Sequence, residues 1–470
     1  MKNLIFTILL FFPLRAIYSQ DTIHVPVDYT SIQAAINASN NGDIVLVADG
    51  LYYENINYRG KAITVASHFL VDDNTSHITN TILDGSQPSN PDSGCVVYFT
   101  SGEDTTSVIC GFTITGGNNG GINCDSSGAK IVNNHIEENE NGHGGGINAN
   151  GSEWIIVEGN KINSNVARGV RISSGEGGGI NMKYIQEGRI SNNVFSQNLA
   201  LQREGHPGGG AIHIYECTSL LISNNTIVDN TADGGSGGGL CIDGFPPIIL
   251  NNIIWGNTAG TDSQVYYNTG NLDIYYSDVQ GGWSGVGNID KYPEFIDTAN
   301  GDFHLSNSSP CIGAGIDAIE IGGLWYYCPL TDLEGNPRPN PLGSMPDMGA
   351  YESPLSVSGI EDYLSKVPNT YLLEQNYPNP FNPSTKIRYS VPQLSNVVIK
   401  VFDILGNEIE TLVNEEKPAG IYEVEFNSHS GFVQNLPSGF YFCQLLVSAL
   451  QSKDGKAGNY IETKKMLLIK

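Results

Sequence analysis

A pattern of apolar and asparagine positions repeats through the middle of the chain. In each copy an apolar residue is followed after three positions by Asn, then by a second apolar residue and a second Asn. The copies are Ile131/Asn134/Ile136/Asn139, Val157/Asn160/Ile162/Asn165, Ile190/Asn193/Phe195/Asn198, Ile222/Asn225/Ile227/Asn230 and Ile249/Asn252/Ile254/Asn257. Successive first asparagines lie 26, 33, 32 and 27 residues apart. This period is typical of a solenoid, whose coils bury their apolar faces only by stacking on one another.

Asparagine at a fixed place in every coil predicts a corner between strands. Its amide tolerates left-handed backbone geometry and can hydrogen-bond neighbouring backbone groups. We therefore expect the repeated asparagines to adopt the corner conformation and to stack into ladders along the solenoid.

Glycine runs share this period. They are Gly120-Gly-Ile122, Gly144-Gly-Gly-Ile147, Gly177-Gly-Gly-Ile180, Gly208-Gly-Gly-Ala-Ile212 and Gly237-Gly-Gly-Leu240. Glycine permits a sharp bend, so each run predicts a turn that leads into a strand. A phosphate-binding loop is disfavoured because no run ends in Gly-Lys-Ser/Thr before a helix.

Strand alternation after each glycine turn predicts which side chains face outward. The apolar residue after the glycines points inward, and so does the residue two positions later. These second inward residues are Cys124, Ala149, Met182, Ile214 and Ile242. The intervening and following residues form two outward columns, namely Asn123, Asn148, Asn181, His213 and Cys241, and Asp125, Asn150, Lys183, Tyr215 and Asp243.

The two columns are our candidate glycan-binding face. Stacked strands lie about 4.8 Å apart, a spacing on which a sugar chain can lie. The predicted substrate-binding residues are Asn123, Asp125, Asn148, Asn150, Asn181, Lys183, His213, Tyr215 and Asp243. The alternative is that these residues are polar only because outward strand positions face water.

The predicted solenoid begins with a capping helix. Ser31 can cap a helix in which Ile32, Ala35 and Ile36 recur at helical spacing. Strands are expected at 44–47 and 63–65, so the helix would lie ahead of the first strands and cover the open end of the solenoid.

Together these features resemble the pectin-lyase-like superfamily of right-handed parallel β-helix proteins. The likeness covers roughly residues 24–352 and includes the entry Ser31-Ile-Gln-Ala-Ala-Ile-Asn37 and the exit from Gly301-Asp-Phe-His-Leu305 to Asp347-Met-Gly-Ala-Tyr-Glu352. It implies an all-β fold with a right-handed parallel β-helix over 21–355. It does not select an activity, since the superfamily includes lyases, hydrolases, epimerases and non-catalytic surface proteins.

A second domain is predicted after a linker at 356–374. From Asn376-Tyr-Pro-Asn-Pro-Phe-Asn-Pro383 onward the pattern changes to alternating strands, which suit a small immunoglobulin-like β-sandwich over 375–470. The strands are expected at 385–391, 397–403, 422–426, 440–446 and 465–469.

This tail resembles the C-terminal sorting domain of type IX secretion substrates. The likeness rests on Asn376–Pro383, Val401-Phe-Asp-Ile-Leu-Gly-Asn-Glu408, Pro418-Ala-Gly420, Leu436-Pro-Ser-Gly-Phe-Tyr441 and Lys464-Lys-Met-Leu-Leu-Ile-Lys470. It implies that residues 375–470 engage the outer-membrane secretion machinery and deliver the protein to the cell surface or the extracellular space.

The N-terminus also indicates export. Residues 1–20 carry Lys2, an apolar run from Leu4 to Leu14 and small or polar residues around Ser19, which is the pattern of a signal peptide. The net charge of −26 excludes a nucleic-acid partner, because such binding depends on clustered basic residues. The same charge repels an acidic polysaccharide except at a basic patch or through a bridging cation such as Ca²⁺.

One basic patch is present in the predicted solenoid. Of eleven Lys and Arg between 21 and 355, six fall between 161 and 203, namely Lys161, Arg168, Arg171, Lys183, Arg189 and Arg203. In β-elimination such groups neutralise a uronate carboxylate while a base removes the adjacent proton. The candidate catalytic residues are Lys183, His213, Tyr215, Arg168 and Arg171. The alternative is that these charges only solubilise variable turns.

Other chemistries are less well supported by the sequence. Gly142-His-Gly144 and Asn123-Cys-Asp125 resemble parts of the polygalacturonase site, but the Asp-Asp pair needed for glycoside hydrolysis is missing, so His143 is interpreted as a loop residue. Asp72-Asp-Asn74 and Asp84 could coordinate Ca²⁺ but lack the spacing of a dedicated site, and we assign no residue to a metal. Cys311 and Cys328 are the pair most suited to a disulfide.

The sequence therefore predicts an exported, surface-directed protein, expected to be monomeric, whose partner is a polysaccharide or surface glycan. We favour a carbohydrate-binding or adhesive function because no complete catalytic constellation is present. A polysaccharide lyase that acts on a uronic-acid polymer is the alternative, and it is a better match than a glycoside hydrolase.

Overall fold

The computed structural model describes residues 20–88, 94–169, 175–201, 208–355, 371–392, 395–417, 420–428, 436–449 and 459–469. The chain divides into two compact units, Met1–Ser356 and Val357–Lys470. All but Gln20 of the predicted signal peptide lies outside the described residues, as do Arg171, Arg203 and nearly all of the predicted linker. No helix in the described part of the chain is long and apolar enough to cross a membrane.

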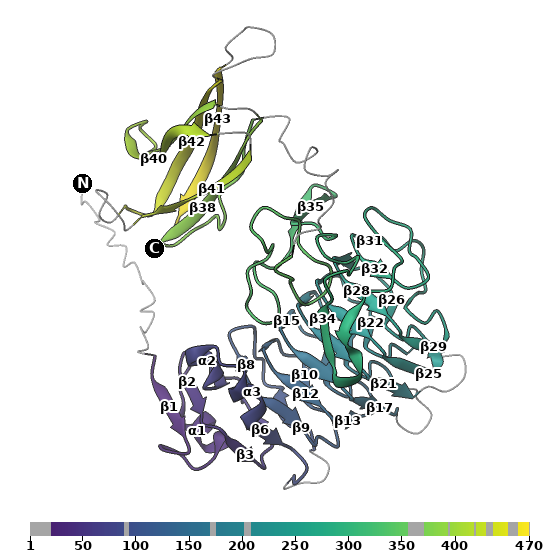
Figure 1. Ribbon diagram of the computed structural model, residues 1–470. Coiled ribbons are helices and arrows are strands. Elements are labelled where there is room, and N and C mark those ends of the chain that lie inside the picture. The colour runs from purple at the N-terminus through teal and green to yellow at the C-terminus, as the bar shows by residue number, and fades with distance from the viewer. Residues whose placement is uncertain are drawn as a thin grey trace, which may run out of the picture. The chain divides into compact units, whose positions relative to one another are not determined.

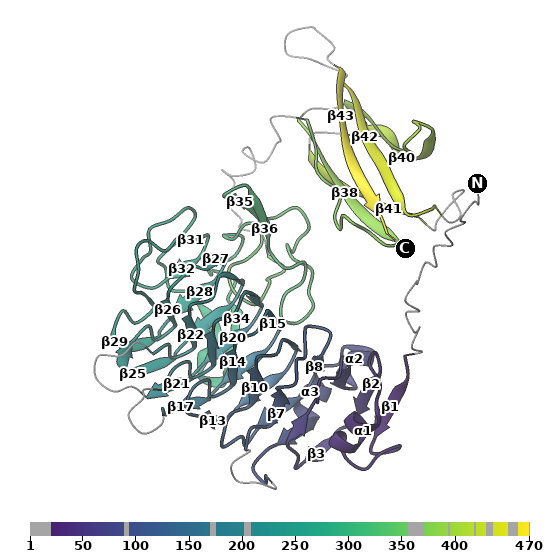
Figure 2. The ribbon, with the colours of Figure 1, turned by 180° about the vertical axis from the view of Figure 1, so that it is seen from behind.

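The first unit is a stack of coils built from four parallel sheets, which Figures 1 and 2 show from opposite sides. Sheet A contains β1 (Thr22–Val25), β2 (Ile44–Val47), β5 (Thr64–Ser67), β8 (Val108–Cys110), β11 (Ala129–Val132), β15 (Trp154–Glu158), β19 (Glu187–Ser191), β23 (Ser219–Ser223), β27 (Ile248–Leu250) and β31 (Ile274–Tyr275). Sheet B contains β3 (Gly50–Tyr52), β6 (Thr81–Asp84), β9 (Thr113–Thr115), β12 (His135–Glu137), β16 (Lys161–Asn163), β20 (Val194–Ser196), β24 (Thr226–Val228), β28 (Ile253–Trp255) and β32 (Asp278–Val279).

Two further sheets complete the coils. Sheet C contains β4 (Ile56–Asn57), β7 (Val97–Phe99), β10 (Ile122–Asp125), β14 (Ile147–Asn150), β18 (Ile180–Lys183), β22 (Ile212–Tyr215), β26 (Leu240–Asp243) and β30 (Val265–Tyr267). Sheet D contains β13 (Glu140–Asn141), β17 (Val166–Ala167), β21 (Leu199–Leu201), β25 (Thr231–Ser236) and β29 (Thr258–Thr261), and it leads through the glycine turns into sheet C. The predicted all-β class, a parallel β-helix followed by a β-sandwich, is confirmed.

The inward positions of the coils form one continuous core. The apolar residues of the repeat and the predicted inward residues of sheet C, from Cys124 to Ile242, are fully buried in it. The predicted alternation of faces after each glycine turn is therefore correct in sheet C.

A helix covers the first coil, as the sequence predicted. In α1 (Ile32–Ala38) the Ser31 side chain accepts a hydrogen bond from the Ala34 amide, and Ile32, Ala35 and Ile36 are buried in the core. The helix was expected ahead of the first strands, and this order was wrong. β1 precedes α1 and pairs with β2 in sheet A. Two short helices, α2 (Phe69–Asp72) and α3 (Ser76–Asn80), lie between β5 and β6.

Buried asparagine ladders join the coils at the corners on either side of sheet B. Asn193 is representative: its Nδ2 donates to Asn225 Oδ1 in the next coil at 3.0 Å and to Val157 O at 2.9 Å. Its Oδ1 accepts from the backbone N of Asn160, at 2.9 Å, and from Asn160 Nδ2, at 3.0 Å. The ladders are Asn134, Asn160, Asn193, Asn225 and Asn252, and Asn139, Asn165, Asn198, Asn230 and Asn257. Every amide thus satisfies backbone groups that a corner leaves unpaired.

The left-handed residue of each corner is not the ladder asparagine but the residue before it. Asn133, Asn192 and Asn224 have φ values of 55°, 54° and 53°. The prediction that the repeated Asn itself adopts the corner conformation was therefore wrong. The preceding residue makes the bend, which directs the ladder amide into the protein interior.

At the glycine turns, backbone segments approach one another closely, which is possible because glycine has no side chain. Gly177 has φ +66°, and a Cβ there would collide with the carbonyl oxygen of Ile180. A Cβ on Gly178 would lie 2.5 Å from Gly210 O of the next coil. Side chains are excluded at this turn because backbone from two coils meets there.

The chain after the last coil folds back over the outer face of sheet B. It contains β33 (Phe295–Asp297), the 3₁₀ helix η2 (Thr298–Asn300), β34 (Asp302–Leu305), β35 (Ala318–Ile321) and β36 (Leu324–Tyr327). Phe303 and Tyr351 pack with Val194 and Val228 of sheet B in a second apolar cluster. Cys311 and Cys328, the pair most suited to a disulfide, are both free thiols, and Cys311 Sγ donates to Asp278 Oδ2 at 3.2 Å.

The second unit is a β-sandwich of two antiparallel sheets. One contains β37 (Leu372–Leu373), β38 (Ser384–Val391) and β41 (Gly420–Asn427), and the other β40 (Glu408–Lys417), β39 (Ser395–Phe402), β42 (Gly439–Ala449) and β43 (Asn459–Leu468). The five predicted strands are present. Sequence reasoning missed β40 because its polar residues lack alternation, and missed β37, which begins three residues before the expected boundary.

We expect Asn193→Ala to lower the free energy of unfolding of the solenoid by about 3 kcal/mol, because it leaves the buried Asn160 amide and Val157 carbonyl without partners. Urea unfolding followed by circular dichroism measures the change. The control is Asn119→Ala, at an exposed turn asparagine of the same unit. Equal destabilisation of the two variants would contradict the role of the ladder.

A histidine in β34 predicts a pH-dependent stability. Hydrogen bonding to Glu334 raises the pKa of His304, burial opposes the change, and Asp302 adds to the increase, which brings the pKa to about 9. A pKa raised in the folded state contributes stability that is complete below the ordinary value of 6.5 and is lost as the pH rises through about 9. The melting temperature of the solenoid should therefore fall between these pH values, and His304→Gln should flatten this part of the profile. An unchanged profile in the variant would count against this assignment.

Candidate functional site

The strand register of sheet C aligns the two predicted columns. Asn123, Asn148, Asn181, His213 and Cys241 occupy matching positions in β10, β14, β18, β22 and β26. Asp125, Asn150, Lys183, Tyr215 and Asp243 occupy matching positions two residues later. The residues that the sequence analysis grouped thus lie on neighbouring strands of one face.

Exposure differs along this face. Asp125 and Tyr215 are exposed, while Asn123, Asn148, Asn150 and Lys183 are half-buried. The expectation that all of these side chains face solvent was wrong at four positions, which have exposed fractions of 5% or less: Asn181, His213, Cys241 and Asp243. Only the first part of the face and the Lys183–Tyr215 edge can therefore meet a polymer.

Hydrogen bonds run along the first column. Asn148 Nδ2 donates to Asn123 Oδ1 at 3.0 Å, and Asn181 Nδ2 donates to Asn148 Oδ1 at 2.8 Å. The remaining Asn181 Oδ1 lies 2.8 Å from His213 Nδ1. A carbonyl oxygen can only accept, so Nδ1 of His213 carries a proton.

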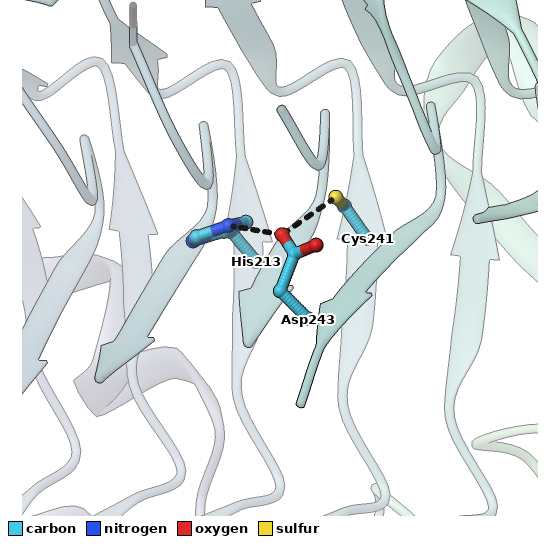
Figure 3. A group of neighbouring side chains, drawn as sticks. All are labelled: His213, Cys241 and Asp243. Atoms are coloured by element: carbon cyan, nitrogen blue, oxygen red, sulfur yellow. Dashed lines mark hydrogen bonds and ion pairs between the residues drawn. The ribbon is translucent and has the colours of Figure 1, made fainter. Parts of the chain in front are cut away.

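The other end of the imidazole faces an acid. His213 Nε2 lies 3.4 Å from Asp243 Oδ2, and Cys241 Sγ lies 3.9 Å from the same oxygen (Figure 3). In the described part of the chain these residues form the one group of three or more His, Cys, Asp or Glu that could hold a metal ion, and their ligand atoms all lie within 4.8 Å of one another.

Glu176, just before the Gly177 turn, lies at the centre of the charges on this face. Its Oε2 forms an ion pair with Lys183 Nζ at 2.5 Å and lies 3.2 Å from His143 Nδ1. Burial raises the pKa of Glu176, but contact with His143, the charge of His213 and the Lys183 ammonium outweigh it and lower the pKa to about 2. Glu176 is therefore ionised and balances the Lys183 charge.

An aromatic pair borders Lys183. Tyr184 follows Lys183 at the corner after β18, and its ring meets the Tyr215 ring edge to face at 5.4 Å. The exposed fractions are 55% for Tyr184 and 37% for Tyr215. Lys183 Nζ lies 5.9 Å from the centre of the Tyr215 ring.

Three of the four described residues of the basic patch are paired with acids. Arg168 pairs with Glu140, Arg189 Nη2 pairs with Glu158 Oε2 at 2.7 Å, and Lys183 pairs with Glu176. The candidates Lys183, His213 and Tyr215 do lie on adjacent strands, whereas Arg168 is engaged by Glu140 and the placement of Arg171 is outside the described residues.

The residues considered for Ca²⁺ lie elsewhere. Asp72 Oδ2 lies 3.3 Å from His77 Nε2, and His77 Nδ1 lies 2.6 Å from Asp49 Oδ1. Asp84 accepts from the Ser86 amide at the end of β6. The carboxylate of Asp72 is thus already engaged by a histidine.

Sequence reasoning missed Glu176, Tyr184 and the role of Cys241. Glu176 lies next to the glycine run, which was interpreted only as a turn, and Tyr184 lies one position beyond the second column. Cys241 was placed in the first column but not among the site residues. Its position beside His213 was already contained in the predicted register.

Comparison with known proteins identifies the tail. Residues 375–454 match the family described as the secretion system C-terminal sorting domain. The predicted type IX sorting domain is confirmed, and the protein is exported to the cell surface or the extracellular space. No curated protein matches the chain.

Two solved structures show a distant similarity. The PL6 family alginate lyase AlyGC shares 15% identity with a TM-score of 0.25, over 72% of this chain and 58% of its own. The enzymatically active domain of bacteriophage CBA120 tailspike protein 4 shares 10% identity with a TM-score of 0.15, over 82% of this chain and 59% of its own. The chain thus spans less than two thirds of the length of either protein.

Proposed function

We propose that this exported protein binds a glycan along the exposed part of sheet C and does not cleave it. The observation that carries the proposal is the exposed Tyr184–Tyr215 pair beside the aligned polar side chains of Asp125, Asn150 and Lys183.

Tyr184, Tyr215, Asp125, Asn150 and Lys183 form one strip, and the chemistry of this strip suits a sugar chain. A sugar ring has one face of C–H groups and an edge of hydroxyls. Tyrosine rings offer apolar area for such a face together with a hydroxyl that can hydrogen-bond. Asn150 Nδ2 donates to Asp125 Oδ1 at 3.2 Å, which holds an amide and a carboxylate in place for the hydroxyl edge. Binding by a prearranged surface loses little side-chain entropy.

The same contacts disfavour a lyase. A base must reach the proton that it removes. Lys183 is paired with Glu176, and His213 is only 1% exposed. Arg168 is neutralised by Glu140, so these groups are poorly suited to stabilise the carboxylate of a bound uronate. Binding therefore accounts for the arrangement better than β-elimination does.

We expect Tyr184→Ala and Tyr215→Ala each to weaken binding at least about tenfold, since each removes apolar contact with the sugar face. The mature chain is tested against immobilised neutral and acidic polysaccharides, with and without Ca²⁺, and the dissociation constant is measured for each polysaccharide that is retained.

Tyr53→Ala is the matched control, because Tyr53 is 50% exposed in the corner after β3. It should bind like the unaltered protein, and all three variants should keep the same melting temperature. Unsaturated uronate absorbance is recorded in parallel. Product from any polysaccharide, or equal loss of binding in the control, would overturn the proposal.

A further inference from the structure

Three buried side chains from two adjacent coils meet on the outward face of sheet C. Cys241 and Asp243 lie two residues apart on β26 and therefore point to the same face, and His213 of β22 is the register partner of Cys241. The exposed fractions are 0% for Cys241, 5% for Asp243 and 1% for His213. Figure 3 shows the imidazole and the thiol on either side of the Asp243 carboxylate.

The asparagine column fixes which atom of His213 faces this acid. Because Nδ1–H donates to Asn181 Oδ1, the second ring nitrogen, Nε2, points toward Asp243 Oδ2. In a neutral imidazole Nε2 then carries a lone pair, which is directed at a carboxylate oxygen away from water. Either a proton or a metal ion can occupy the space between this nitrogen and the carboxylate oxygen.

The donor set and its geometry match a transition metal. Metal-binding histidines characteristically donate their other N–H to an oxygen acceptor. Here the acceptor is Oδ1 of Asn181. A tetrahedral ion with Zn–N and Zn–O of about 2.0–2.1 Å and Zn–S of about 2.3 Å separates N from O by about 3.3 Å and S from O by about 3.5 Å. The corresponding separations in the protein are 3.4 Å and 3.9 Å, and all three ligand atoms lie within 4.8 Å of one another, so the thiol must move closer to the other two ligands to bind the ion.

We propose that His213 Nε2, Cys241 Sγ and Asp243 Oδ2 bind one divalent transition-metal ion, with Zn²⁺ the best match. A thiolate and a carboxylate together balance the charge of the ion, and a sulfur–nitrogen set disfavours Ca²⁺ and Mg²⁺, which prefer oxygen. Cysteine binds with loss of its thiol proton to solvent. The ion would link β22 to β26, and the inference does not depend on the proposed glycan binding.

Glu176 is outside this ligand set. Its charge acts on both His213 and Cys241, so it lies near the cluster. Its carboxylate is already paired with Lys183 and His143. Three protein ligands leave the fourth position of a tetrahedral ion to another ligand.

The test uses the untagged mature chain, stripped with a chelator and titrated with Zn²⁺ and with Co²⁺. We expect one tightly held equivalent of Zn²⁺ by mass spectrometry of the desalted protein and a higher melting temperature with metal. The Co²⁺ form should show the near-ultraviolet charge-transfer band of a cobalt–thiolate bond. Retention of no metal would overturn the proposal.

Variants assign the ligands. Cys241→Ser should abolish the cobalt–thiolate band and lower the Zn²⁺ affinity at least about tenfold, and Asp243→Asn should lower the affinity with the band retained. The matched control is Cys217→Ser, at a second buried free thiol near sheet C, which should keep both the band and the affinity. A band that persists in Cys241→Ser would contradict the site.

One measurement needs no variant. X-ray absorption at the zinc edge of the unaltered protein should show one sulfur neighbour at about 2.3 Å together with imidazole scattering. A spectrum with only oxygen and nitrogen neighbours would place any bound ion elsewhere and overturn the assignment. Glycan binding is measured on the same samples, so failure of one proposal is distinguishable from failure of the other.

Discussion

The buried amide ladders are the interaction on which the solenoid depends. A coil that turns sharply leaves backbone N–H and C=O groups without strand partners, and their burial is unfavourable unless each finds a hydrogen bond. In this protein an asparagine such as Asn193 satisfies groups in its own corner, in the coil before and in the coil after. A shift of one residue would break all of these bonds, so the ladders fix the register of stacking.

That register also determines what the surface of sheet C can do. Because the coils stack in register, residues at the same position of successive coils lie side by side and form a column. The chemistry of a column changes along the solenoid as the residue type changes from coil to coil. Asn123, Asn148 and Asn181 repeat one amide, and the next coils substitute His213 and Cys241. The hydrogen bonds of the amides thereby end on an imidazole and set its orientation. A structural repeat thus becomes a means of positioning a reactive group.

The parts that sequence reasoning predicted are those that depend on local spacing. The repeat period, the inward alternation from Cys124 to Ile242 and the strands of the tail all follow from residues close together in the chain. The burial of His213 could not be predicted in this way, because its ring contacts Asn181 and Asp243, which belong to the coils before and after its own. The same reason explains why the packing of Phe303 and Tyr351 on sheet B was not anticipated: their partners lie more than a hundred residues earlier or on another coil.

The charge of the chain limits which classes of glycan can bind the proposed strip. With a net charge of −26 on the chain and with Lys183 and Arg168 each paired to an acid, the proposed strip has little positive charge to offer a polyuronate. Long-range repulsion is screened beyond about 8 Å at physiological ionic strength, but contact with the strip occurs within that distance. The tyrosine pair, by contrast, contacts C–H groups that neutral and acidic sugars share. A neutral polymer therefore satisfies the aromatic contacts without the repulsion, whereas an acidic polymer needs a bridging cation to occupy the same surface.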